Sequence, residues 1–173
     1  LMINEAKKND WIMFADDDTF FSGEYLRNAC EYILSPDCRE DIVTGLVRAN
    51  GRVLSPISRD TWHLNNHPIQ TTGLYDDIFC INSGLFIKRE IFDKIGGYDE
   101  AMFMDMIDFY LFDALKSARI NRVMVIDGII TQSFSGDEGV YSKSMERRFH
   151  IFKKDFYIYC DRANKGFLYR IIV

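Results

Sequence analysis

A short apolar run that ends in three consecutive aspartates constrains the fold more than any other part of this sequence. Residues 11–15 read WIMFA, and Asp16, Asp17 and Asp18 follow directly. A run of this length, bounded by charged residues, is typical of a buried β-strand. The three carboxylates repel one another, so they need a cation or hydrogen-bond donors nearby. Because ligands bind at the carboxyl ends of strands in open α/β sheets, we expect a polar site at the end of this strand.

Strand-like and helix-like segments alternate along the rest of the chain. The predicted strands lie at residues 41–48, 52–54, 78–81, 85–87 and 122–126. The predicted helices span residues 22–34, 89–95, 105–118 and 142–163, and residues 1–8 resemble the end of another helix. Residues 55–77 show no period, which predicts a long loop. With 173 residues, 47% of them hydrophobic, the chain can bury a core, and the alternation predicts an α/β fold.

Charge and cysteine usage narrow the functional classes. The formal net charge of -5 argues against a protein that binds nucleic acid by neutralising many phosphates. No stretch reaches the roughly 20 continuous apolar residues that a membrane-spanning helix needs. The four cysteines form no CxxC pair and no cluster with zinc spacing, which indicates thiols in a reducing compartment.

The aspartates after the first strand are the strongest candidates for chemistry. Asp16 and Asp18 offer hard carboxylate oxygens, which suit Mg²⁺ or Mn²⁺. Such ions commonly bridge one or two carboxylates to the phosphates of a substrate. The other interpretation is a polar turn that caps the helix predicted at residues 22–34. From the residues alone, both interpretations stay open.

A second pair of carboxylates lies near the start of a predicted helix. Asp105 and Asp108 are three residues apart, so they would share one helix face. A carboxylate in this position can act as a general base if a substrate hydroxyl lies within hydrogen-bond reach. It can equally serve only to cap the helix.

Three further segments could contact a ligand. Asn82, Ser83 and Gly84 interrupt two strand-like runs, where a glycine marks either a bulge or a close approach of the backbone to a ligand. Trp62, in the predicted loop, has a ring that can stack on the apolar face of a sugar. Two basic pairs, at 147–148 and 153–154, could contact pyrophosphate or anionic lipid headgroups, or could lie on an ordinary solvated helix face.

Taken in order, these segments resemble the family 2 glycosyltransferases of the GT-A fold, the nucleotide-diphospho-sugar transferase fold. Residues 14–19 (FADDDT) resemble the Asp-x-Asp motif of that family, and residues 81–89 (INSGLFIKR) resemble its acceptor-side strand. Residues 95–100 (IGGYDE), followed by residues 103–108 (FMDMID), resemble its segment with the catalytic aspartate. Within that family, the segments resemble those of bacterial rhamnosyl- and galactofuranosyl-type members.

The resemblance implies a domain organisation and residue roles. Residues 1–135 would form the acceptor-side, C-terminal part of a GT-A catalytic domain, and residues 136–173 an amphipathic helical extension. The nucleotide-binding half would be missing, so we expect this fragment alone to be inactive. Asp16 and Asp18 would hold Mn²⁺ or Mg²⁺ on the donor diphosphate, Asp17 would contact the donor, and Asp108 would be the catalytic base. The acceptor would be bound by Trp62, Asn82, Ser83, Gly84 and Asp105.

The implied reaction is an inverting transfer of a sugar from a nucleotide-diphospho-sugar donor to a glycan or lipid-linked acceptor, in cell-envelope polysaccharide synthesis. The resemblance places it in the cytoplasm, peripheral on the inner face of the cell membrane. We also expect self-association through an open sheet edge beside residues 11–14. One departure is Gln132, which stands where many members have a histidine that binds the metal. Whether Gln132 replaces that ligand stays open.

Two other functions compete with this interpretation. The chain could be a non-catalytic binding or assembly module that keeps a GT-A-like fold. It could also be a haloacid-dehalogenase-type phosphatase, which also has an Asp-x-Asp after a buried strand. That class needs a threonine or valine two places after the second aspartate, and Thr19 comes one place early.

Overall fold

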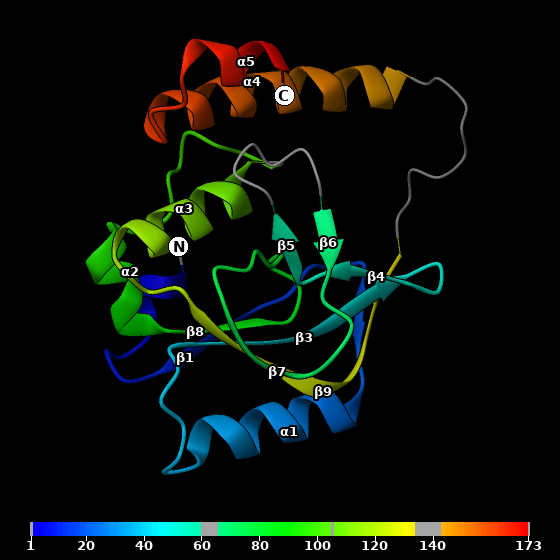
Figure 1. Ribbon diagram of the computed structural model, residues 1–173, viewed down its shortest axis with the longest axis vertical. Coiled ribbons are helices and arrows are strands. Elements are labelled where there is room, and N and C mark those ends of the chain that lie inside the picture. Colours follow the sequence, from blue (N-terminus) through cyan, green and yellow to red (C-terminus); the bar gives the residue numbers. More distant parts are fainter. Residues whose placement is uncertain (1, 60–65, 105, 134–142, 173) are drawn as a thin grey trace.

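A computed structural model describes residues 2–59, 66–104, 106–133 and 143–172 (Figure 1). Its main sheet has seven strands. Five of them lie side by side in the order β1 (Trp11–Phe14), β8 (Leu85–Lys88), β3 (Ile42–Ala49), β9 (Arg122–Gln132) and β2 (Thr19–Phe21). β4 (Arg52–Ser55) pairs with β3, and β7 (Gly73–Asp76) pairs with β9. β3 and β9 are parallel, whereas β8 runs antiparallel to both of its neighbours, so the sheet is mixed.

Helices cover both faces of this sheet and form a further layer on one side (Figure 1). The helices are η1 (Met2–Glu5, a 3-10 helix), α1 (Gly23–Leu34), α2 (Arg89–Ile95), α3 (Ile107–Ser117), α4 (Lys143–Arg162) and α5 (Phe167–Ile172). α1 packs on one face through Tyr25 and Ala29, while α2 and α3 pack on the other through Ile91, Phe92 and Leu111. α4 and α5 lie outside α3. The predicted α/β class is confirmed.

Local signals explain where the first two α-helices begin and end. Ser22 caps α1, because its side chain accepts a hydrogen bond from the backbone N–H of Tyr25. Gly96 ends α2 in the left-handed conformation, with φ at 81°, which glycine adopts without steric cost. Asn50 and Gly51 form the hairpin that joins β3 to β4, and both adopt a positive φ.

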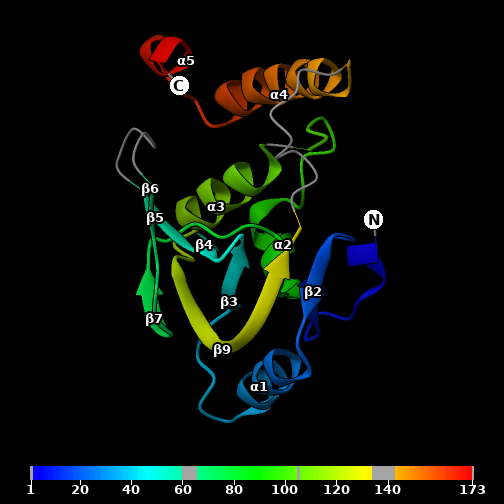
Figure 2. The same cartoon turned by 90° about the vertical axis from the view of Figure 1, so that its right-hand side faces the viewer.

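A bend in β9 brings two distant parts of the chain together (Figure 2). The first half of β9 pairs with β7, and its last three residues pair with β2. Gly128 lies between the halves with φ at 136°, and a Cβ atom there would lie 2.4 Å from Cα of Tyr25. Only glycine fits so close to α1. The bend carries Gln132 to the loop between β1 and β2, which contains the three aspartates.

Several predicted elements need correction. The strand predicted at residues 122–126 extends to Gln132, and the strand predicted at residues 78–81 does not form. Part of the predicted loop at residues 55–77 forms β7 and the hairpin of β5 (Ile57–Arg59) and β6 (Asn66–Pro68). These strands are only three or four residues long, and β6 is exposed throughout, so they leave no hydrophobic period.

β1 lies at the end of the main sheet, which corrects the prediction of a buried strand. Each of its four side chains is half-buried, because no strand of the described residues pairs with its outer edge. Self-association through this edge stays a prediction.

Candidate functional site

The three aspartates form the connection between β1 and β2, two strands that are not neighbours in the sheet. Thr19 donates a backbone hydrogen bond to the carbonyl of Asp16, at 3.3 Å, which closes a turn. Ser133, directly after β9, donates to the carbonyl of Asp18 at 3.0 Å. The loop is therefore held by both its own turn and the end of β9.

Ser83 joins the first of these aspartates to the segment before β8. Its side chain is fully buried, and its hydroxyl donates a hydrogen bond to Oδ2 of Asp16. The hydroxyl of Thr19 lies 3.1 Å from Oγ of Ser83 and 3.3 Å from Oδ1 of Asp18. Two sequence motifs that were predicted separately therefore meet in one hydrogen-bonded cluster.

Gly84 gives this cluster its backbone geometry. Its φ of 80° is in the left-handed region, and a Cβ atom there would lie 2.8 Å from Cδ1 of Ile130. Its N–H donates to the carbonyl of Phe14 at 3.0 Å, and its carbonyl accepts from the hydroxyl of Tyr25. The structure thus gives Gly84 a packing role, and its predicted contact with an acceptor stays a prediction.

Gln132 lies against two of the aspartates. Its Nε2 atom is 3.2 Å from Oδ1 of Asp18 and 3.5 Å from Oδ2 of Asp16. Its Oε1 atom is buried and has no hydrogen-bond partner among the described residues. Two carboxylate oxygens from different residues therefore converge on a single amide group. The resemblance to the glycosyltransferases singled out Gln132 as a possible metal ligand. Its contacts with Asp16 and Asp18 depend on the bend of β9, which the sequence does not predict.

This arrangement fits a cation that takes some of its ligands from a substrate. Within the described part of the chain, no three acidic, histidine or cysteine side chains gather into a complete metal cage. Mg²⁺ is usually held by one or two carboxylates together with waters and substrate phosphates, so a complete cage is not required. Asp16 and Asp18 supply the two converging oxygens, and Gln132 can supply a third if its amide turns over.

Asp108 is the candidate carboxylate of the second predicted pair that the structure describes. It is in the first turn of α3, where the helix dipole favours a carboxylate, and its Oδ1 atom is buried. The N-cap position is Met106, so Asp108 is not the capping residue. The helix-capping interpretation of the pair stays open, because Asp105 lies outside the described residues.

Tyr98 is influenced by carboxylates from both predicted groups. Its hydroxyl donates a hydrogen bond to Oδ1 of Asn82 at 3.0 Å. Burial raises the pKa of this hydroxyl, and the negative charges of Asp108 and, more weakly, Asp16 raise it further. Both carboxylates therefore lie within electrostatic range of one phenol. Tyr98 stays protonated at neutral pH and remains a hydrogen-bond donor.

A pocket of about 650 Å³ opens beside these residues. Ala15, Asn82, Tyr98 and Ile107 contribute to its lining, and each is a sequence neighbour or hydrogen-bond partner of a predicted site residue. The side nearest β1 is apolar. A ligand bound there would lie beside both the start of α3 and the connection between β1 and β2 that contains the three aspartates.

Three predicted site residues are not placed by these contacts. Trp62 and Asp105 lie outside the described residues. Asp17 is exposed at the surface of the loop. Their predicted roles in acceptor and donor binding stay predictions.

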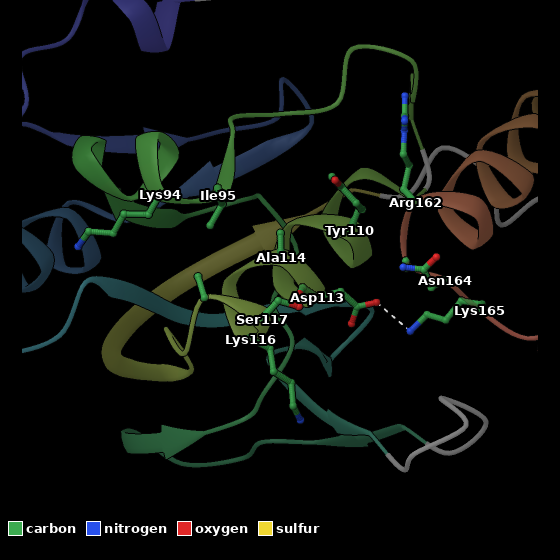
Figure 3. Close-up of a pocket in the computed structure, with 12 residues that line it drawn as sticks. Lys94, Ile95, Tyr110, Asp113, Ala114, Lys116, Ser117, Arg162, Asn164 and Lys165 are labelled. Carbon is green, nitrogen blue, oxygen red and sulfur yellow. Dashed lines mark hydrogen bonds and ion pairs between the residues drawn. The ribbon is translucent and has the colours of Figure 1, made fainter.

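A second hollow, of about 670 Å³, lies where the C-terminal ends of α2, α3 and α4 meet (Figure 3). Four cationic side chains line it, although the chain as a whole is acidic. Each lies within 3.5 Å of a carboxylate, in the pairs Lys94–Glu90, Lys116–Asp77, Arg162–Asp99 and Lys165–Asp113. Helix C-termini attract cations, so structural ion pairs account for this hollow.

Comparison with protein-family models gives no match, and no curated protein is significantly similar to the chain. The functional interpretation below therefore depends on the geometry of the site and on the resemblance of its motifs.

Proposed function

We propose that the chain carries the acceptor side of an inverting glycosyltransferase of the GT-A fold. Its substrates would be a nucleotide-diphospho-sugar and a glycan or lipid-linked acceptor. The observation that supports this most is the meeting of the Asp-x-Asp loop, the Asn82–Ser83–Gly84 segment and Asp108 around Tyr98. A transferase needs these groups together, since the donor phosphates and the acceptor hydroxyl flank one sugar.

Asp16 and Asp18 would hold Mn²⁺ or Mg²⁺, which stabilises the negative charge that develops on the departing diphosphate. Ser83 and Gln132 orient the two carboxylates through their hydrogen bonds. This outer layer keeps the oxygens converging on one point, as polar neighbours of metal ligands commonly do.

Asp108 would take the proton of the acceptor hydroxyl as its oxygen attacks the anomeric carbon of the sugar. The new C–O bond forms on the face opposite the departing diphosphate, so the configuration inverts. Asp108 must be ionised for this step. Tyr98 and Asn82 would position the sugar, because they line the pocket and are hydrogen-bonded to each other.

Binding of a panel of uridine, guanosine and thymidine diphosphate sugars tests this function, measured by calorimetry with Mn²⁺ and with chelator on this chain and on a longer natural form that carries the nucleotide-binding half. We expect at least one to bind the longer form in a Mn²⁺-dependent manner, and binding to be lost in Ser83→Ala/Asp16→Asn. A failure of every sugar nucleotide to bind either form would contradict the transferase. Mn²⁺-dependent binding without transfer to any acceptor would favour the non-catalytic module. Release of inorganic phosphate from phosphomonoesters would favour the phosphatase.

A further inference from the structure

The outer surface of α4 carries an exposed row of large side chains. Met145, Phe149, Lys153 and Tyr157 follow one another at steps of four, so they lie along one line of the helix. All four are exposed, Phe149 to 60% and the other two apolar members to 47% each. Burying such a row against a partner of matching chemistry is favourable, whereas leaving it in water is not.

Basic residues flank this row. Residues 143–154 contain five lysines and arginines but only one acidic residue, Glu146, in a chain whose net charge is -5. Lys143, Arg147 and Lys154 are exposed, as is Lys153 within the row. The positive charge is therefore concentrated on one stretch of an otherwise acidic molecule. This concentration points to an anionic partner.

The buried packing contacts of α4 come from its other face. Phe156 and Tyr159 bury the other face of the helix in a cluster with Met102 and Met106. The buried carboxylate of Asp155 accepts hydrogen bonds from the backbone N–H groups of Phe103, at 3.0 Å, and Met104, at 2.7 Å. The C-terminal half of α4 is thus fixed to the body, while its first turns project beyond α3 (Figures 1 and 2).

We propose that the exposed row and its flanking basic residues dock the protein on a bilayer of anionic lipids. Basic side chains near the surface are attracted to anionic headgroups. Exposed aromatic rings beside them suit the boundary between headgroups and acyl chains. None of the described helices has the length and apolarity to cross a membrane, so the contact is with the bilayer surface. A second copy is a poorer partner, because two equally basic surfaces repel. The docking does not depend on the proposed transferase activity.

Vesicle flotation with the whole chain tests the docking. The vesicles contain either phosphatidylcholine alone or phosphatidylcholine with phosphatidylglycerol. We expect binding only to the anionic vesicles, and weaker binding at high salt. Lys153→Gln/Lys154→Gln should lower the partition coefficient about 30-fold, since each lysine contributes independently to the free energy of binding to an anionic surface. Phe149→Ser should lower it further.

The matched control is Lys7→Gln/Lys8→Gln, which removes two adjacent exposed lysines in the turn before β1. It should leave vesicle binding within about twofold of the wild type, because these lysines lie outside the proposed surface. An equal loss in both double variants would overturn the proposal, as would equal binding to neutral vesicles or no binding. A dimer that dissociates on Phe149→Ser, seen by sedimentation velocity, would assign the surface to a second copy and would also overturn it.

Discussion

The side-chain amide of Gln132 lies 3.2 Å from the carboxylate of Asp18, although 114 residues separate the two in the sequence. The same amide nitrogen lies 3.5 Å from Asp16. In the absence of a cation, this donor offsets part of the repulsion between the two carboxylates. With a cation between them, the amide can turn over and present its oxygen instead. Gln132 would then act as the third ligand of the ion.

Substitution of Gln132 tests that role. Gln132→Ala should weaken Mn²⁺ binding about tenfold, because the amide oxygen that would act as the third ligand is lost. Gln132→Glu should bind Mn²⁺ more tightly than the wild type but unfold at a lower temperature without Mn²⁺, since three carboxylates then repel one another. Electron paramagnetic resonance of free Mn²⁺ gives the affinity. Gln70→Ala, at an exposed glutamine, should change neither quantity. Identical effects of the two alanine variants would contradict the assignment.

Asp18 should matter more than Gln132 for the same ion. Asp18→Asn removes one of the two converging carboxylate charges, so we expect Mn²⁺ affinity to fall by at least about 100-fold. Any activity should lose its dependence on Mn²⁺ at the same time. Asp37→Asn is the matched control, since Asp37 is exposed in the turn after α1 and is expected to leave Mn²⁺ binding unchanged. Activity that continues unchanged in chelator would refute a metal role for Asp18.

The proposed base can be separated from donor binding. Asp108→Asn should reduce sugar transfer by at least about 100-fold, because the amide cannot accept the proton of the acceptor hydroxyl. Donor affinity should stay within about twofold, since that carboxylate is not assigned to the donor. Calorimetry and a transfer assay on the same preparation, both on the longer form that carries the nucleotide-binding half, distinguish the two effects.

A control on the same helix shows whether loss of packing explains the result. Asp113→Asn removes the charge that pairs with Lys165 and weakens the hydrogen bond from Tyr159, so it should lower thermal stability with little effect on transfer. If Asp108→Asn instead loses donor binding and transfer together, Asp108 is not acting as a base.

The sequence predicts those features of the fold that depend on neighbouring residues, and it does not predict those that depend on contacts between distant segments. The helix start at Ser22 and the helix end at Gly96 were predictable, because capping is decided within one turn. The bend at Gly128 was not, because it depends on the approach of β9 to Tyr25 across the fold. Similarly, the sequence identified Asp16 and Ser83 as separate candidates, but their hydrogen bond exists only because β8 lies beside β1.

Glu40 provides a test of the fold that is independent of function. It is almost fully buried, accepts hydrogen bonds from the hydroxyl of Tyr32 and the N–H of Arg39, and lies 3.5 Å from Arg122. Burial alone would raise the pKa of the Glu40 carboxyl, but these partners outweigh it, so its pKa lies below the usual range. The ionised carboxylate therefore stabilises the folded state at neutral pH, and this contribution is lost as the pH falls through the lowered pKa.

Glu40→Gln should accordingly lower the free energy of unfolding by about 1–3 kcal/mol at pH 7. The difference from the wild type should shrink in acid, where the wild-type carboxyl is protonated as well. Urea unfolding at several pH values measures it, with Glu31→Gln on the exposed face of α1 as the control. A difference that stays constant down to low pH would show that the charge of Glu40 does not stabilise the fold.

Paramagnetic broadening by Mn²⁺ in the amide nuclear magnetic resonance spectrum tests most directly whether the two groups of aspartates share one site. As Mn²⁺ is added, the amide signals of Asp18, Ser83 and Gln132 should broaden first, followed by those of Tyr98 and Asp108. The signal of Lys165, which follows α4 and pairs with Asp113 in the second half of α3, should broaden last, and Asp18→Asn should abolish the whole pattern. Broadening that reaches Lys165 before Asp108, or that persists in Asp18→Asn, would contradict a shared site.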